Sequence, residues 1–301
     1  MSSESTALRV APDGFTREQW AAFMRDGVLT IENAIPDEEV EEYLEGMERI
    51  VRAIPGHKPG RHVMLHNFVE RDPVFAKAID HPRHIGYAYD LFGEQTKLNI
   101  GQLFQRPPGG GLTKWHFDGP RALPYSVFSP YLPLEIKVGY WLTDLPEPNM
   151  GNFTYVPGSH MRPYFDAYDT LDPVEGEVPL IVRRGAMTFM HCNIWHKVQN
   201  NDSDVTRKNF FLAYSPSWIT ARDRVVSDPA WLATLDREQR IIMRSYEQQT
   251  HHAKPLASDY PLFLSRENHT DRDPGHYRED LGIHLRKRIT GAEKLIAEAP
   301  R

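Results

Sequence analysis

The chain has 301 residues, of which 40% are hydrophobic, 11% aromatic and 25% charged, a composition typical of a globular protein with a sizeable core. Its formal net charge is −6, from 35 basic and 41 acidic side chains, which argues against nucleic acid or an anionic membrane as the main partner. The single cysteine, Cys192, excludes an internal disulfide framework and a cysteine-rich metal site. With no signal-peptide pattern and no apolar run of about 18 residues, we expect a cytoplasmic protein.

The first third of the chain has a helical pattern. Residues 15–26 carry aromatic side chains at helical spacing, and Gly27 is expected to end that helix before a short apolar strand at 28–31. A second helix is predicted over 36–53 and further helix over 73–93. We expect these segments to pack against a larger core.

From Lys97 to about Pro216 the chain consists of short β-rich runs separated by Gly, Pro and Asn. Strands are predicted near 97–106, 113–118, 135–143, 152–156, 178–183, 186–191, 195–199 and 207–214. This series suits a two-sheet jelly roll, so the predicted fold class is mainly β with flanking helices around a double-stranded β-helix. Helix is predicted again at 228–249. We expect one domain over 14–250 and a C-terminal extension over 251–301.

His116 and Asp118 form an H-x-D tripeptide on the predicted strand 113–118. Residues i and i+2 of a strand project to the same face, so both side chains can bind one metal ion. A second imidazole from a distant strand, for which His196 is the candidate, would complete a set of two histidines and one carboxylate. That set leaves coordination positions open and suits a non-haem Fe(II) oxygenase. The tripeptide alone is weak evidence, because a chain with 14 histidines produces such triplets by chance.

Arg207 stands at the start of the run RKNFFLAY, shortly after His196. A guanidinium binds a carboxylate through two parallel hydrogen bonds. A cosubstrate that chelates iron through a keto acid and ends in a second carboxylate needs such an anchor, and Arg207 is the candidate.

The segment 121–134, directly after the H-x-D motif, is longer than a strand connection needs and contains Tyr125, Phe128 and Tyr131. We expect these aromatic side chains to form a lid or a wall against the substrate. The alternative is a loop that packs its own aromatic residues together.

Several segments in order and spacing resemble the phytanoyl-CoA dioxygenase family of Fe(II)/2-oxoglutarate oxygenases. They are WHFDGP (115–120), GYWLTDLPEPNMGNFTYVPGSH (139–160), RRGAMTFMHCNIWHKVQN (183–200) and Arg207. The PGSH tetrapeptide after the G-N-F-x-Y-V strand is the most recognisable of these landmarks. The resemblance covers roughly residues 14–218 and implies a jelly-roll enzyme that requires Fe(II), 2-oxoglutarate and O2. It also implies oxidation of a small molecule, with release of succinate and CO2.

The resemblance further implies roles for individual residues. The family's iron ligands, which form its catalytic centre, match His116, Asp118 and His196. Arg207 matches the partner of the distal carboxylate of 2-oxoglutarate, and Trp141 and Gln102 match positions that line the cosubstrate site. Relatives that halogenate carry a small residue in place of the carboxylate, so the presence of Asp118 favours hydroxylation or another C–H oxidation, by analogy in specialised metabolism.

Two other functional classes stay open at this point. One is a non-catalytic jelly-roll protein that retains a metal site without turnover. The other uses the same three ligands for a different metal, such as zinc in hydrolysis, although hydrolysis needs no dicarboxylate anchor like Arg207. The acidic net charge argues against an acyl-CoA substrate, because CoA carries several phosphates. The pattern fits a monomer and a homodimer equally.

Overall fold

The computed structural model describes residues 12–93, 96–119, 133–162 and 165–244. Tyr125, Phe128 and Tyr131 and the extension 251–301 therefore lie outside the described residues. Among the described residues, no helix is both long and apolar enough to cross a membrane.

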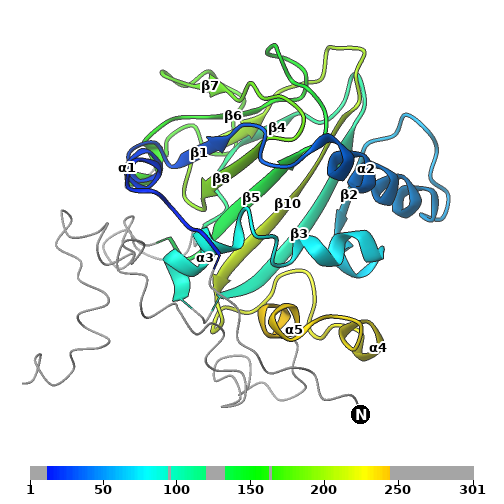
Figure 1. Ribbon diagram of the computed structural model, residues 1–301. Coiled ribbons are helices and arrows are strands. Elements are labelled where there is room, and N and C mark those ends of the chain that lie inside the picture. Colours follow the sequence, from blue (N-terminus) through cyan, green and yellow to red (C-terminus); the bar gives the residue numbers. More distant parts are fainter. Residues whose placement is uncertain (1–11, 94–95, 120–132, 163–164, 245–301) are drawn as a thin grey trace, which may run out of the picture.

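Two antiparallel sheets form the centre of the fold (Figure 1). The larger sheet contains, in spatial order, β1 (Val28–Ile31), β8 (Met187–His191), β5 (Ile136–Trp141), β10 (Arg207–Pro216), β3 (Thr96–Arg106) and β2 (Val63–His66). The smaller sheet contains β4 (Thr113–His116), β9 (His196–Val198), β6 (Phe153–Tyr155) and β7 (Val178–Pro179). Strand neighbours are far apart in sequence, which is the connectivity of a jelly roll. The predicted fold class is confirmed.

Helices cover the outer face of the larger sheet (Figure 1). In chain order they are α1 (Arg17–Asp26), α2 (Asp37–Arg52), the 3-10 helices η1 (Phe68–Glu70) and η2 (Pro73–Ala78), α3 (Ile85–Phe92), α4 (Pro229–Leu232) and α5 (Arg237–Met243). A further 3-10 helix, η4 (Ser159–Met161), follows β6 of the smaller sheet, and its Ser159 accepts a hydrogen bond from the backbone N–H of Trp195. Helix α1 begins with a capping box between Thr16 and Gln19 and ends at Gly27, whose φ of 76° favours glycine. Local capping signals therefore set both ends of this helix.

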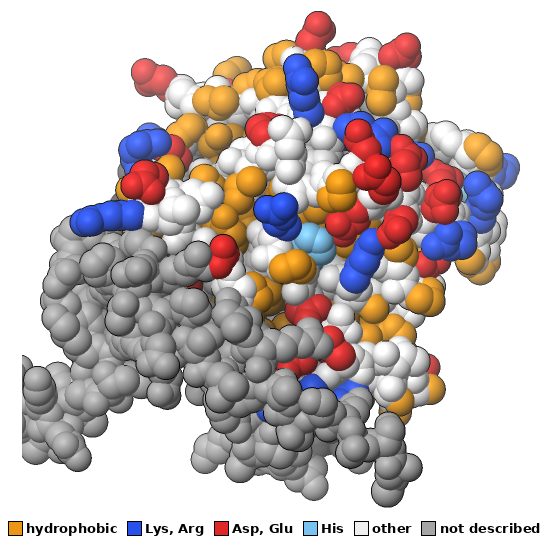
Figure 2. Space-filling view, in the orientation of Figure 1, with side chains coloured by type: hydrophobic (Ala, Val, Ile, Leu, Met, Phe, Trp, Pro, Cys, Tyr) orange, Lys and Arg blue, Asp and Glu red, His pale blue; other side chains and the backbone are white. Residues whose placement is uncertain are grey.

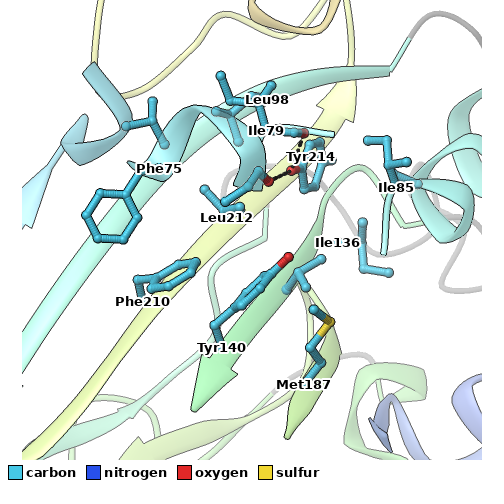
Figure 3. Packing of buried hydrophobic residues seen from close by; sticks show 14 of the residues in the cluster. Phe75, Ile79, Ile85, Leu98, Ile136, Tyr140, Met187, Phe210, Leu212 and Tyr214 are labelled. Carbon is cyan, nitrogen blue, oxygen red and sulfur yellow. Dashed lines mark hydrogen bonds between the residues drawn. The ribbon is translucent and has the colours of Figure 1, made fainter. Parts of the chain in front are cut away.

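The alternation of side chains along β5 and β10 separates the core from the site. Tyr140, Phe210, Leu212 and Tyr214 point outward and pack against η2 and α3, as Figure 3 shows. Their neighbours in sequence point the other way, toward the smaller sheet. Each buried aromatic or aliphatic side chain contributes roughly 1.5–3 kcal/mol, so a shift of register by one residue would bury the polar face. The inward face is thereby held in one register.

Acidic side chains of α2 gather on the face of the molecule seen in Figure 2. Surface ion pairs connect them to other elements: Arg184 contacts Glu41 at 2.6 Å and Lys208 contacts Glu48 at 2.7 Å. Exposed pairs of this kind contribute about 0–1 kcal/mol each. The apolar side of α2, not its ion pairs, therefore holds the helix in place.

The structure corrects several predicted element boundaries. Strand β4 ends at His116, so Phe117 and Asp118 are not on it. The reason is that the backbone N–H groups of Asp118 and Gly119 donate to the carbonyl of Cys192, not to a strand partner. The sequence analysis also overlooked β2, and predicted more strand than β7 contains.

The predicted helices over 73–93 and 228–249 are each interrupted. Pro82 follows η2, and a proline inside a helix removes a hydrogen bond and clashes with the preceding turn. In the second case α4 and α5 are separate, because Asp236 caps the start of α5 in its own capping box with Gln239. Residues 245–249 lie outside the described part of the chain.

A buried histidine links the helical layer to the larger sheet. His84 lies with Nδ1 at 2.7 Å from the hydroxyl of Tyr140 and with Nε2 at 2.7 Å from the hydroxyl of Tyr214. Tyr214 donates its own proton to the carbonyl of Ile79 at 2.8 Å, so it accepts from His84 Nε2–H. Nδ1 is then free to accept from Tyr140. A neutral imidazole, protonated on Nε2, can therefore form a hydrogen bond with both tyrosine hydroxyls.

We predict that His84→Ala destabilises the fold by on the order of 3 kcal/mol, because it leaves a cavity and a buried tyrosine hydroxyl without its partner. Urea unfolding at pH 7.5 measures this loss. His57→Ala, in the loop after α2, is the control and should change little. Equal effects of the two substitutions would contradict the structural role of His84.

Burial also holds the pKa of His84 well below its usual value. The unfolded chain then binds a proton near pH 6.5 that the folded chain refuses. We predict that the stability present above this pH falls as the pH is lowered through and below 6.5. Urea unfolding between pH 7.5 and 5 checks this, and the fall should be shallower in a folded His84→Gln variant.

Candidate metal centre and cosubstrate site

Three potential metal ligands meet between the two sheets. His116 on β4 lies directly opposite His196 on β9, with ring centroids 4.2 Å apart. Asp118 joins them because its backbone N–H and that of Gly119 bond to Cys192 at 2.9 and 2.7 Å. The ligand atoms of the three side chains all lie within 4.8 Å of one another. Among the described residues they are the group of His, Cys, Asp and Glu with this property.

Backbone contacts determine which imidazole nitrogen faces the centre. Nδ1 of His116 lies 2.8 Å from the carbonyl oxygen of Lys114, and Nδ1 of His196 lies 2.9 Å from that of Ile194. A carbonyl oxygen only accepts hydrogen bonds, so each Nδ1 carries the proton. In the neutral form of each ring Nε2 then has the lone pair, which is the arrangement that outer partners impose on metal-binding histidines.

The surroundings of His196 and Asp118 favour protonation states that can bind a cation. Burial lowers the pKa of His196 to about 3, with the neighbouring His116 acting in the same direction, so its imidazole is neutral. Burial alone would raise the pKa of Asp118, but the positive charge of Lys137, which contacts its carboxylate, holds it well below its usual range. Two imidazoles and one ionised carboxylate fit a divalent ion such as Fe(II), and leave coordination positions free.

Arg207, at the start of β10, is a buried cation near this centre. Its side chain is 1% exposed, and its guanidinium lies 4.9 Å above the ring of Trp141. Nε donates to Asn209 at 3.0 Å, and Nη1 donates to the carbonyl of Gly151. Gly151 precedes by two residues Phe153, whose ring stacks on His196 at 4.8 Å. The guanidinium and the three ligands therefore share one interior region.

None of the described acidic side chains forms an ion pair with Arg207. A buried charge without a partner is costly, so the site is incomplete without an anion. The carboxylate of a small ligand would supply it. This fits a dicarboxylic 2-oxoacid, which would bring one carboxylate to Arg207 and the other end to a metal.

The remaining candidates occupy different places. Trp141 lies under Arg207, and its indole N–H donates to Thr188 at 3.0 Å. Gln102 is on the same face of the larger sheet, opposite Phe211, but its amide lies 3.5 Å from Nε2 of His66 and forms no hydrogen bond with Arg207, His116, Asp118 or His196. Its role at the cosubstrate stays a prediction.

Two basic residues of the site were missed by the sequence analysis. Lys137 contacts Oδ2 of Asp118, and Arg106 lies directly opposite Arg207 on the neighbouring strand. The available signal was a charged residue at an inward position of an otherwise apolar strand, as in I-K-V-G-Y-W. The partner of each cation could be identified only once the pairing of the strands was known.

The comparisons with known proteins agree with this geometry. The family model "Phytanoyl-CoA dioxygenase (PhyH)" matches residues 23–209. Ectoine dioxygenases from Bordetella bronchiseptica and Bordetella parapertussis are each 25% identical to this chain over 250 residues, which cover 67% of this chain and 76% of theirs.

Two solved structures share the fold. HygX from Streptomyces hygroscopicus, determined with nickel and 2-oxoglutarate bound, matches with a TM-score of 0.59 at 21% identity and covers 69% of this chain and 90% of its own. The non-haem alpha-ketoglutarate-dependent epimerase SnoN from nogalamycin biosynthesis matches with a TM-score of 0.53 at 21% identity, over 66% of this chain and 82% of its own.

Fold and family together define the class of protein as a dioxygenase with a jelly-roll core. The chain belongs to the phytanoyl-CoA dioxygenase family of Fe(II)/2-oxoglutarate oxygenases. The predicted family and enzyme class are thereby confirmed, and nothing in the comparisons supports a non-catalytic or hydrolytic protein.

We predict that Lys137→Met destabilises the metal-free protein by about 3–5 kcal/mol, because it leaves the carboxylate of Asp118 buried without a positive partner. A divalent ion should restore more of the melting temperature in this variant than in the wild type. Thermal unfolding with EDTA and then with Co(II) measures both effects.

Lys197→Met is the matched control. Its side chain is 11% exposed, like that of Lys137, and it also contacts a carboxylate, Glu177 at 2.9 Å. Glu177 is more exposed than Asp118 and lies away from the three ligands. Equal losses in both variants, with equal metal responses, would contradict a special role for Lys137.

Proposed function

We propose that this dioxygenase binds Fe(II) through His116, Asp118 and His196 and anchors 2-oxoglutarate at Arg207, and that it oxidises a C–H bond of a small molecule. Succinate and CO2 are the coproducts. The observation that carries the proposal is a buried arginine without an acidic partner beside a set of two histidines and one carboxylate. A hydrolytic zinc enzyme has no use for that arginine.

Iron and 2-oxoglutarate, when bound, supply the activation of O2. The chain's own residues hold these groups and control their surroundings. The Nε2 atoms of both histidines and the carboxylate of Asp118 would hold the metal, while Arg207 would receive the distal carboxylate in a two-pronged hydrogen bond. Trp141 packs against the guanidinium and keeps water from it, which strengthens the charge interaction in the dry interior.

The relatives support a small organic substrate. The Bordetella proteins are named for ectoine, HygX was determined with hygromycin B, and SnoN with nogalamycin RO. These compounds differ widely in size and shape, so the shared fold does not specify one substrate. The presence of the carboxylate of Asp118 favours hydroxylation or a related C–H oxidation in this chain. A cytoplasmic setting is part of the proposal and is supported by the buried free thiol of Cys192.

The proposal is tested by adding Fe(II) and then 2-oxoglutarate to the full-length protein without oxygen. We expect a visible charge-transfer band from the chelated iron. His196→Ala should abolish the band, because two ligands hold this metal weakly, and Arg207→Ala should raise the 2-oxoglutarate concentration needed by at least 10-fold, with little change in iron affinity.

Arg162→Ala is the control for Arg207→Ala. Arg162 also lies over a tryptophan, Trp195, at 5.2 Å, but on the outer side of the smaller sheet. It should leave the band unchanged. Iron binding without a band in the wild type would refute the proposal, and equal effects of Arg207→Ala on the iron and 2-oxoglutarate requirements would refute the anchor.

A further inference from the structure

Glu135 is a buried carboxylate directly before β5. The residue is 8% exposed. Nη2 of Arg222 donates to its Oε2, whereas its Oε1 is buried and has no hydrogen-bond partner among the described residues. A buried carboxylate oxygen that accepts no hydrogen bond is costly. The free oxygen therefore requires an explanation.

Glu135 and Asp118 are held by the same residue. Cys192 donates its backbone N–H to the carbonyl oxygen of Glu135 at 3.2 Å, and its own carbonyl oxygen accepts from the N–H of Asp118 at 2.9 Å. Lys137, two positions after Glu135, contacts the carboxylate of Asp118. Residues i and i+2 of an extended chain project to the same face. The carboxylate of Glu135 therefore faces the interior beside the candidate metal centre.

The order of side chains along the inner face of β5 separates Glu135 from the 2-oxoglutarate anchor. Trp141 packs under Arg207 at one end of the strand. Lys137 lies beside Asp118, and Glu135 precedes the strand at its other end. At about 3.4 Å per residue, Lys137 lies roughly 13 Å from Trp141 along the strand, and Glu135 roughly 7 Å beyond it. 2-Oxoglutarate would occupy the side of the metal that faces Arg207, which leaves the side of Glu135 for the substrate.

Arg222 reaches Glu135 from the segment after β10. Its Nε donates to Oδ1 of Asn99 at 2.9 Å, and its backbone N–H donates to the carbonyl oxygen of the same residue at 3.0 Å. These two bonds fix the guanidinium at one oxygen of Glu135. The side chain of Arg222 is 41% exposed, so water screens its charge. The pair therefore orients Glu135 and leaves Oε1 available.

The charges around Glu135 favour a cation at the free oxygen. Burial raises the pKa of Glu135 to about 7, and the charge of Asp118 acts in the same direction. Arg222 and Lys137 oppose this rise, but Lys137 already pairs with Asp118. The folded protein thus lacks positive charge at this carboxylate. A protonated amine would supply both the charge and a hydrogen-bond donor.

We propose that Oε1 of Glu135 binds a positively charged nitrogen of the substrate, which places the substrate in the class of small protonated amines. The inference rests on the proposed function and deepens it by naming the class of substrate. An amine bound at Glu135 would hold its neighbouring carbon atoms on the free side of the metal beside Asp118. A neutral or anionic analogue would leave the buried oxygen unpaired, and the site would therefore discriminate against it.

The test uses the full-length protein loaded with Fe(II) and 2-oxoglutarate without oxygen. The probes are n-butylammonium, n-butanol and butyrate, which are similar in size and differ in charge. Their binding is followed by the melting temperature and by the change in the charge-transfer band. We expect the wild type to bind butylammonium at least 10-fold more tightly than the other two. Glu135→Gln keeps the shape and removes the charge, so it should lose this preference and keep the wild-type affinities for Fe(II) and 2-oxoglutarate.

Arg222→Gln distinguishes substrate binding from a purely structural ion pair. It breaks the same pair but leaves both oxygens of Glu135 in place, so the preference for butylammonium should be at least as large as in the wild type. A purely structural role predicts equal effects of Arg222→Gln and Glu135→Gln. Glu177→Gln is the control, because Glu177 also pairs with a lysine, Lys197 at 2.9 Å, but lies away from the three ligands. It should behave as wild type.

Distinct outcomes overturn distinct statements. Equal binding of the three probes by the wild type would reject the amine class, and a preference for butylammonium that persists in Glu135→Gln would reject the role of Glu135. Butanol binding as tight as that of butylammonium, and lost in Glu135→Gln, would assign Oε1 to a hydroxyl donor instead. If Glu135→Gln fails to fold, unchanged affinity for butylammonium in Glu135→Asp, whose carboxylate is one methylene shorter, rejects the proposal. No band in the wild type before any probe is added would reject the proposed function itself.

Discussion

The buried positive charge on the inner face of the larger sheet is the constraint on which the site depends. Arg207, Arg106 and Lys137 all point into the barrel from strands of this sheet. Desolvation makes each charge costly unless it has a negative partner. Lys137 has one in Asp118, whereas the two arginines have none among the described residues. The proposed function supplies a negative partner for Arg207 in the distal carboxylate of 2-oxoglutarate.

The smaller sheet and the segment after it carry the candidate metal ligands. His116 and His196 come from its paired strands, and Asp118 follows where the backbone leaves β4 and bonds to the segment after β8. The three candidate metal ligands therefore belong to the smaller sheet and the segment after β4, and the arginines to the larger sheet. In the proposed function, 2-oxoglutarate would join the metal on one sheet to the guanidinium on the other.

The outer face explains why this interior is held so firmly. Aromatic residues of β5 and β10 pack under η2 and α3, and the His84 network satisfies the polar groups among them (Figure 3). Because side chains alternate along a strand, the packing of one face determines the register of the other. Family members with different substrates can keep this framework and vary the segments at the barrel opening.

The sequence by itself determined the class of fold, the family and the residues most suited to bind a metal and a carboxylate. Periodicity, turn residues and the H-x-D and PGSH motifs are local signals. They can be recognised in the sequence without knowing which residues lie nearby in the folded protein. Arg207 was recognisable because its chemistry matches one ligand and its spacing matches one family. The helix breaks at Pro82 and before Asp236 were also local, and closer reading of those residues would have found them.

Only the tertiary structure decided what each of these side chains meets. Asp118 leaves its strand because of a carbonyl 74 residues away in sequence, at Cys192, and Arg106 matters because it pairs with a residue about a hundred positions later. Pairing between distant strands depends on the packing of the whole sheet, which has no local signature. Burial, too, is a property of the assembled fold, and only the fold shows that Arg106 and Arg207 are buried without an ion pair to a described acidic side chain.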